Sequence, residues 1–380
     1  MSIYFDYNAT TPLDSGVRDK IIPYFDQDWG NPSSVHAKGR KARAILDDFR
    51  DRLALLWKAK PSEVVFTSGG SEANNMAIFG SARHLRDKGR HLITSSIEHH
   101  AVLYCYEYLE KKEGFQVTYL PVDGSGIVNP DDLAAAIRPD SILCSIMSAN
   151  NETGSIQPYA ALGDICREKE VLFHCDGVQS LGKEPFNDIH QFHADLVTCC
   201  SHKFHGPKGS GALFIKSPLL PDPIVFGGGQ ENERRAGTEN LPLVCGFVEA
   251  FESLVCSPVF QSVDLKPHIA RFLELIDSME GVAFRGSRDS RLCNTVSFSV
   301  EEADSIAMIA GLDMEGVCAS SGSACSAGSV TPSHVLQAMG VGDAESSALV
   351  RLSLGRESSR AEVDHLITVL PSVIQRIRGW

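Results

Sequence analysis

Three segments of the sequence carry side chains that could act on one ligand. Lys203 follows the apolar run 196–200 and precedes a glycine-rich turn. A lysine amine is the group that forms a Schiff base with an aldehyde. Asp176 comes directly after another apolar run, where its carboxylate could keep a ring nitrogen protonated. The segment 68–75, Ser-Gly-Gly-Ser-Glu-Ala-Asn-Asn, precedes a helical pattern, and free N–H groups beside glycines can hold a phosphate.

A thiol lies in a fourth segment, the small-residue run 319–329, which has too little bulk to bury Cys325. The 11 cysteines of the chain follow no repeating spacing and include no C-x-x-C pair. This pattern favours reduced thiols over a disulfide framework or a zinc ribbon. Most of the other cysteines fall in apolar periodic stretches, where cysteine packs as a small apolar residue. Cys325 does not share that setting.

Each feature also has an ordinary structural explanation when it is taken alone. The segment 68–75 could be a turn with a helix cap, and Asp176 could cap a helix. A single lysine is usually a surface residue, although the apolar strand and tight turn around Lys203 weaken that interpretation. His99 and His100 end another strand, where an imidazole could stack on a ring, but a lone histidine is more often structural.

Nucleotide and metal sites are disfavoured. The chain has neither a Walker A pattern nor a G-x-G-x-x-G pattern. Neighbouring strand residues point to opposite faces and standard zinc spacing is absent, so few of the possible ligands could converge. Those ligands would be His174, Cys175, Cys199, Cys200, His202 and His205.

These side chains need a scaffold that brings strand ends together. From about residue 60 to 215 short β-rich runs alternate with helical patterns, which predicts a mainly parallel sheet covered by helices on both faces. Ligands bind at the carboxyl ends of such strands, where Asp176 and Lys203 lie. Past about residue 255 the pattern indicates a smaller α+β domain.

Composition excludes several other classes of protein. The formal net charge of −13 argues against a general nucleic-acid binder, and the basic stretch 39–44 is typical of a solvated helix face. No apolar run approaches the roughly 20 residues that a membrane helix needs. The first residues lack the basic start and apolar stretch of a signal peptide, so we expect a cytoplasmic protein.

A phosphate cradle, a carboxylate for a pyridine nitrogen and a Schiff-base lysine are what pyridoxal phosphate requires of a protein. At this point the chain resembles the cysteine desulfurases related to NifS and IscS, which are fold-type I pyridoxal-phosphate enzymes. The resemblance runs nearly end to end. The matching motifs occupy residues 4–14, 30–43, 66–75, 98–102, 150–158, 174–180, 201–211, 227–242, 320–326 and 351–359.

The resemblance implies an α/β fold with a large cofactor-binding domain, 15–255, built on a mainly parallel seven-stranded sheet. It implies a smaller α+β domain from 1–14 and 256–380, which carries the cysteine loop at about 319–332. It also implies a homodimer. We expect no metal, no membrane and no direct nucleic-acid partner.

The resemblance also assigns roles to individual residues. Lys203 corresponds to the Schiff-base lysine, Asp176 to the partner of the pyridine nitrogen, and His99 to the residue that stacks on the ring. Cys325 corresponds to the nucleophile. The expected phosphate ligands are Gly70, Ser71, Cys200, His202 and Thr238 of the other subunit. Gln179 is expected to contact the ring oxygen. Asn150 and Arg356 are expected to bind the substrate carboxylate.

The implied reaction removes sulfur from L-cysteine, leaving alanine and a persulfide on Cys325 for a sulfur acceptor in iron–sulfur cluster assembly or thio-modification. The acceptor and the preference for cysteine over selenocysteine stay open, as does the order of the Cys325 loop. Alternatives are a selenocysteine lyase or another pyridoxal-phosphate lyase or aminotransferase of this fold, and, more remotely, a non-catalytic scaffold. Cys200 stands where the family commonly has a phosphate-binding serine, and a thiol is the weaker hydrogen-bond partner. The longer tail that docks the cluster scaffold in the housekeeping enzymes is expected to be lacking.

Overall fold

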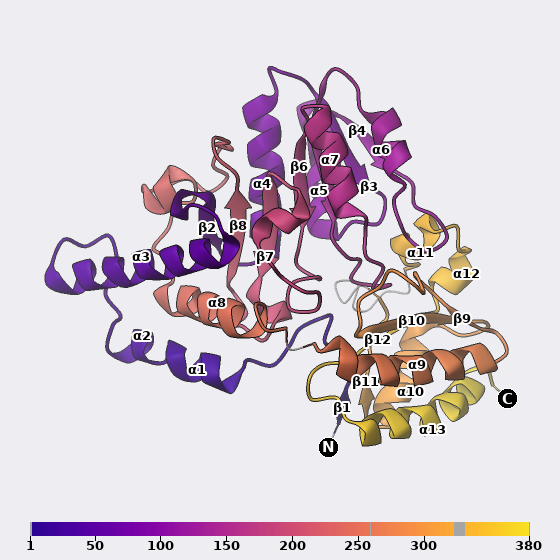
Figure 1. Ribbon diagram of the computed structural model, residues 1–380. Coiled ribbons are helices and arrows are strands. Elements are labelled where there is room, and N and C mark those ends of the chain that lie inside the picture. The colour runs from indigo at the N-terminus through magenta and orange to yellow at the C-terminus, as the bar shows by residue number, and fades with distance from the viewer. Residues whose placement is uncertain (1, 259, 323–330, 380) are drawn as a thin grey trace.

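A seven-stranded sheet forms the centre of the molecule (Figure 1). The structure is a computed structural model that describes residues 2–258, 260–322 and 331–379. β8 is antiparallel to both of its neighbours, β2 and β7, and the other neighbouring pairs are parallel. The predicted mainly parallel seven-stranded sheet is therefore confirmed. The strand order is β2 (Val64–Thr67), β8 (Gly211–Ile215), β7 (Leu196–Cys200), β6 (Leu172–Asp176), β5 (Ser141–Met147), β3 (His91–Ser95) and β4 (Gln116–Leu120).

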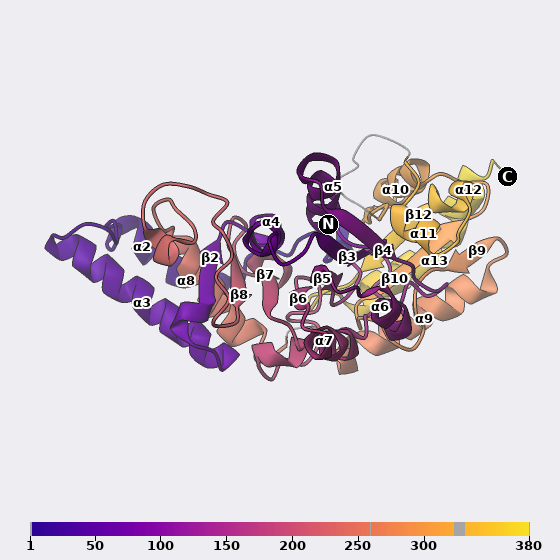
Figure 2. The same cartoon turned by 90° about the horizontal axis from the view of Figure 1, so that it is seen from above.

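Helices cover both faces of this sheet, as Figure 2 shows from above. All strands except the edge strand β4 are buried along nearly their whole length, so their sequences read as continuous apolar runs rather than alternating ones. One face packs against α4 (Gly70–Leu85) and α5 (His100–Glu113). The other face packs against α1 (Ser15–Ile21), α3 (Ala37–Trp57), α6 (Pro130–Ala136), α7 (Tyr159–Glu168) and α8 (Leu241–Leu254), with α2 (Pro23–Asp26) beside α1.

A second hydrophobic core lies beside the sheet. It contains Phe5 and Tyr7 from the start of the chain together with residues between 260 and 374. An antiparallel sheet of order β12-β10-β9 and a parallel pair β1-β11 support it. The elements are β1 (Ile3–Tyr4), α9 (Ser262–Ser278), β9 (Val282–Phe284), β10 (Thr295–Val300), α10 (Ser305–Met314), β11 (Val317–Cys318), α11 (His334–Ala338), α12 (Asp343–Ser346), β12 (Leu349–Ser353) and α13 (Arg360–Ile377).

Two helices, α4 and α5, begin at the edge of the sheet where the sequence predicts the ligand to bind. At the start of α5, the His99 side chain accepts a hydrogen bond from a backbone N–H, and the helix ends at Gly114 with a positive φ of 74°. Gly69 precedes α4 without any side chain to cap it, so the first N–H groups of that helix stay available. In the described part of the chain, no helix is long and apolar enough to cross a membrane.

Candidate active site

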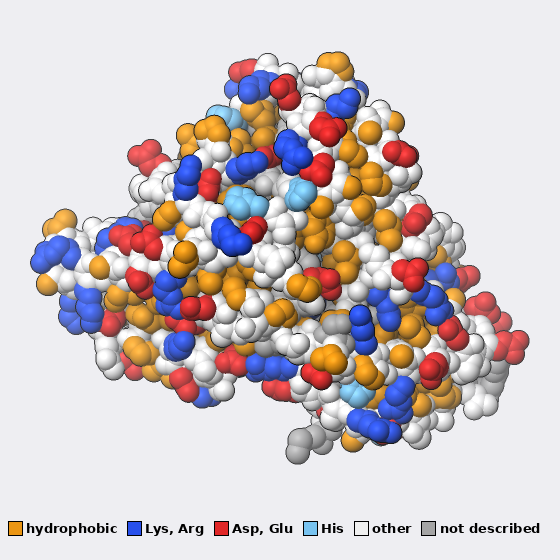
Figure 3. All heavy atoms as spheres, in the orientation of Figure 1, with side chains coloured by type: hydrophobic (Ala, Val, Ile, Leu, Met, Phe, Trp, Pro, Cys, Tyr) orange, Lys and Arg blue, Asp and Glu red, His pale blue; other side chains and the backbone are white. Residues whose placement is uncertain are grey.

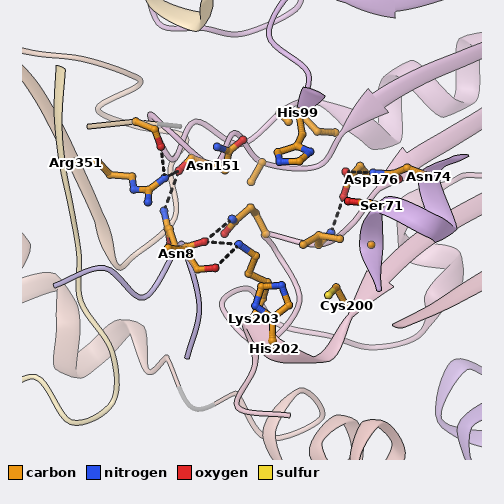
Figure 4. Close-up of a pocket in the computed structure, with 17 residues that line it drawn as sticks. Asn8, Ser71, Asn74, His99, Asn151, Asp176, Cys200, His202, Lys203 and Arg351 are labelled. Atoms are coloured by element: carbon orange, nitrogen blue, oxygen red, sulfur yellow. Dashed lines mark hydrogen bonds between the residues drawn. The ribbon is translucent and has the colours of Figure 1, made fainter. Parts of the chain in front are cut away.

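A cavity of about 280 Å³ lies at the carboxyl ends of the central strands, beside the N-terminal residues Asn8 and Ala9 (Figure 4). This is the edge where the sequence predicts the ligand to bind. Predicted residues that line it are Gly70, Ser71, His99, Asp176, Gln179, Cys200, His202 and Lys203. Cys325 lies outside the described residues.

Lys203 enters the cavity because β7 ends at Cys200 and a single 3-10 turn, Ser201–Lys203, follows. Its Nζ donates hydrogen bonds to the backbone oxygens of Asn8 at 2.6 Å and Ala9 at 2.9 Å (Figure 4). Burial, followed by the positive charge of Arg351, lowers the pKa of Lys203 to about 8. A substantial share of a lysine with this pKa is neutral near physiological pH, which is the form that attacks an aldehyde.

Asp176 is the last residue of β6 and is 7% exposed. Its Oδ2 accepts a hydrogen bond of 2.7 Å from Asn74 Nδ2, and its Oδ1 accepts one of 3.0 Å from the Val178 N–H. These donors orient the carboxylate while it still faces the cavity. Asn74 was not predicted, although it stands one helical turn after Gly70 on α4, a spacing that places both on one helix face.

The start of α4 forms an anion cradle. Gly70 packs closely, because a Cβ there would come within 3.1 Å of Val178 and 3.5 Å of Cys200. A second hollow, of about 330 Å³, adjoins the cavity at this helix end and is lined in part by Gly70, Ser71 and Lys208. Backbone N–H groups at a helix start, with a lysine nearby, suit a phosphate.

Cys200 offers this cradle little hydrogen bonding. Its thiol lies 3.8 Å from the Ser210 carbonyl oxygen, and burial raises its pKa, so it is a neutral thiol. Ser201 does not compensate, because its hydroxyl donates to the backbone oxygens of Pro207 and Ser210.

Two histidines line the cavity without a carboxylate partner among the described contacts. His99 Nδ1 accepts from the Ala101 N–H, and burial lowers its pKa. His202 Nδ1 lies 3.1 Å from the Thr10 hydroxyl, and burial, then the charge of Lys203, lowers its pKa to about 3. Both rings are therefore neutral near pH 7.

The two predicted substrate ligands are not placed in the cavity. Asn150 is fully buried, and its side chain donates to Ile97 O and accepts from the Glu152 and Thr153 N–H groups. The next residue, Asn151, lines the cavity, and Asn150 does not. The physical reason is that the first asparagine of the pair closes the 150–154 turn.

Arg356 pairs with Asp14 at 2.8 Å and does not line the cavity. The arginine that lines the cavity is Arg351, on β12. It donates to Asp6 Oδ1 at 2.7 Å and to the backbone oxygens of Asn151 and Gly322, both at 2.8 Å.

Thr238 is exposed and lies just before α8, away from the cavity lining of its own chain. The prediction assigns it to the site of another subunit. The ion pair of Arg235 with Glu72, N–O 2.7 Å, holds its segment against α4.

The donor set fits pyridoxal phosphate. The Lys203 amine suits the aldehyde of that molecule, the Asp176 carboxylate suits its ring nitrogen, and the free N–H groups at the start of α4 suit its phosphate. Arrangements of this kind occur at the strand ends of many α/β enzymes, so the arrangement alone does not name the family.

The family model for class-V aminotransferases matches residues 3–366. The cysteine desulfurase IscS of Dictyoglomus turgidum is 42% identical over 99% of this chain and 95% of its own length. That of Methanosarcina thermophila is 42% identical over 100% of this chain and 93% of its own. The chain belongs to the cysteine desulfurase family. The predicted family, enzyme class and fold are thus confirmed.

Solved structures agree with this assignment. A NifS-like protein superposes with a TM-score of 0.91 at 32% identity, covering 99% of this chain and 100% of its own. A structure titled SspA in complex with cysteine has a TM-score of 0.82 at 36% identity, with 94% and 100% covered. Cysteine desulfurases depend on pyridoxal phosphate, and the cavity described above has the donors for it.

Proposed function

We propose that this desulfurase binds pyridoxal 5′-phosphate in the 280 Å³ cavity and removes sulfur from L-cysteine, leaving L-alanine and a persulfide on Cys325. The observation that carries the proposal is the position of Lys203, an amine of pKa about 8 that lines the same cavity as the Asp176 carboxylate and the start of α4. The relative whose title names bound cysteine supports the substrate.

Bound pyridoxal phosphate supplies an aldehyde for amine exchange and a ring that withdraws electrons from the substrate. The chain does the rest. Lys203 holds the cofactor and, once freed by the substrate amine, can carry the α-proton at its Nζ. Asp176 would pair with the ring nitrogen and favour its protonated form, and the neutral imidazole of His99 would contact the ring. The start of α4, with Gly70 and Ser71, binds the phosphate, His202 adds a ligand, and Cys200 lines the wall.

The sulfur leaves the substrate when the Cys325 thiolate attacks it. The new S–S bond forms as the bond from sulfur to the substrate β-carbon breaks. The bonding pair stays with the β-carbon, which takes up a proton, and the carbon skeleton departs as alanine. Because the attacking species is the thiolate, this step requires a reduced cysteine. We therefore place the enzyme in the cytoplasm, where thiols stay reduced.

For the substrate carboxylate we propose Asn151, in place of Asn150, together with Arg356. In this arrangement the Arg356 guanidinium exchanges Asp14 for the carboxylate. Arg356→Met should raise KM for cysteine without changing cofactor capture, whereas Arg351→Met should change both. A KM unchanged in Arg356→Met would remove this residue from the substrate site.

The two hydrophobic cores support a division into a large domain, 15–255, and a small domain, 1–14 with 256–380. We propose a homodimer in which Thr238 completes the phosphate site of the partner subunit. The sulfur acceptor would be a protein of iron–sulfur cluster assembly or thio-modification that reaches Cys325.

Cofactor and nucleophile can be tested separately. The purified protein should be yellow, and borohydride should fix the cofactor to the peptide that contains Lys203, as mass spectrometry would show. Cys325→Ser should keep the colour and lose sulfide release from cysteine. Cys256→Ser, at an exposed thiol, is the matched control and should keep both. Sulfide release from Cys325→Ser at the wild-type rate without added thiol would favour a selenocysteine lyase or another lyase, and a colourless protein would refute the enzyme.

A further inference from the structure

A second lysine, Lys183, is buried directly behind the cavity and has no assigned role. It is 2% exposed, and in the described part of the chain its amine donates hydrogen bonds to neutral amide oxygens. Its Nζ donates to Gln179 Oε1 at 2.5 Å and to Asn8 Oδ1 at 2.9 Å. The ring of Phe260 lies 5.6 Å from the same nitrogen. A buried lysine is costly to keep, so its contacts are informative.

These contacts determine which way the Gln179 amide points. On one side of the amide is the Lys183 amine, which donates hydrogen bonds. On the other side is the Asn8 backbone oxygen, which only accepts, and Gln179 Nε2 donates to it at 3.1 Å. A flipped amide would place two acceptors against each other on that side, so only one orientation satisfies both neighbours.

The Asn8 side chain is held in the same manner. Its Nδ2 donates to Thr295 Oγ1 at 2.9 Å and to the Asn151 backbone oxygen at 3.3 Å. Its Oδ1 therefore faces Lys183, and it also accepts from Asn294 Nδ2 at 3.2 Å. Both oxygens that face Lys183 accept a hydrogen bond from its amine, and these hydrogen bonds fix the position of the amine.

We propose that Lys183 is a positioning residue that fixes the Gln179 amide so that its NH2 group faces the cavity and donates a hydrogen bond to the phenolic oxygen of the cofactor ring. The inference rests on the proposed function, because it presumes that the cofactor binds here. A donor at this oxygen stabilises its anionic form, whereas the opposite amide orientation would place an acceptor there and repel it.

The test is a double-mutant cycle on the dissociation constant of pyridoxal phosphate, measured by equilibrium dialysis, with the absorption spectrum of the bound cofactor as a second readout. Lys183→Met keeps the length of the side chain and removes its donors. We expect it to weaken binding about five- to tenfold, the worth of one such hydrogen bond, and to shift the pH at which the spectrum changes. In a Gln179→Leu background the same substitution should have no further effect.

Gln179→Glu is a second test variant that should keep the fold, because the new carboxylate can pair with Lys183. It should remain folded by circular dichroism and show the same spectral shift, since it has no N–H to donate. Lys183→Gln, which can still donate, should recover most of the affinity lost in Lys183→Met. Equal losses from Lys183→Met in both Gln179 backgrounds, or no loss in either, would overturn the proposal. A wild-type chain that takes up no pyridoxal phosphate would instead refute the proposed function.

Discussion

The lowered pKa of Lys203 makes a quantitative prediction about cofactor capture. Burial and the nearby Arg351 charge lower this pKa from 10.5 to about 8. At pH 7.5, roughly one amine in four is neutral at a pKa of 8, against roughly one in a thousand at the ordinary value. Since the neutral amine attacks the aldehyde, the cofactor-free chain should capture pyridoxal phosphate roughly 200-fold faster at pH 7.5 than an ordinary lysine would.

Stopped-flow absorbance after mixing with pyridoxal phosphate measures this rate between pH 6 and 10.5. The rate, once corrected for the titration of the cofactor itself, should rise about tenfold per pH unit and level off near pH 8. That correction is the rate measured with Nα-acetyl-lysine divided by the neutral-amine fraction of Nα-acetyl-lysine at each pH. Lys203→Ala supplies the blank. Arg351→Met should move the break to higher pH, because a positive charge leaves and Asp6 loses its partner. A wild-type rate that keeps rising through pH 9.5 would refute the electrostatic reasoning.

Three further predictions concern buried charged groups. Burial raises the pKa of Glu98 from 4.5 to about 8, so between these pH values the folded chain holds a proton that the unfolded chain releases. As pH rises from 4.5 to 8, the free energy of unfolding of the wild type should therefore fall by a few kcal/mol relative to Glu98→Gln, as melting curves would show. Arg50→Met strands the buried Glu231 carboxylate, whose ion pair measures 2.6 Å, and should lower the free energy of unfolding by about 3–5 kcal/mol in chemical denaturation. Asp176→Asn should lower kcat about 10²-fold or more while borohydride still fixes the cofactor.

The sequence predicts the positions of Asp176 and Lys203 well, for a physical reason. Asp176 is the last residue of one buried strand, and Lys203 lies three residues after the end of another. A parallel sheet gathers the carboxyl ends of its strands at one edge. The same rule places Gly70 and His99 at that edge. Where the position of a residue depends only on which strand or helix carries it, the pattern of apolar runs is enough to predict that position.

Side-chain direction does not follow from that rule. Asn150 and Asn151 are adjacent and identical, and only the hydrogen bonds of the turn decide that the first closes it while the second lines the cavity. For Arg351, on β12, and Arg356, just after it, the sequence likewise does not show which side chain points into the cavity. Their separation by five residues is small in sequence, but Asp6 holds one guanidinium and Asp14 holds the other.

The N-terminal segment could not be predicted as part of the site, because its contacts are all distant in sequence. β1 pairs with β11, and Asp6 is joined to Arg351, whose guanidinium also holds the Gly322 oxygen at the start of the segment that carries Cys325. Two residues further on, Asn8 accepts the hydrogen bond of Lys203. The amine that we propose holds the cofactor, and the arginine that contacts the start of the segment with the proposed nucleophile, are thus supported by the same few residues. Arg351→Met should therefore slow cofactor capture and sulfide release together, whereas two independent supports would let one survive the loss of the other.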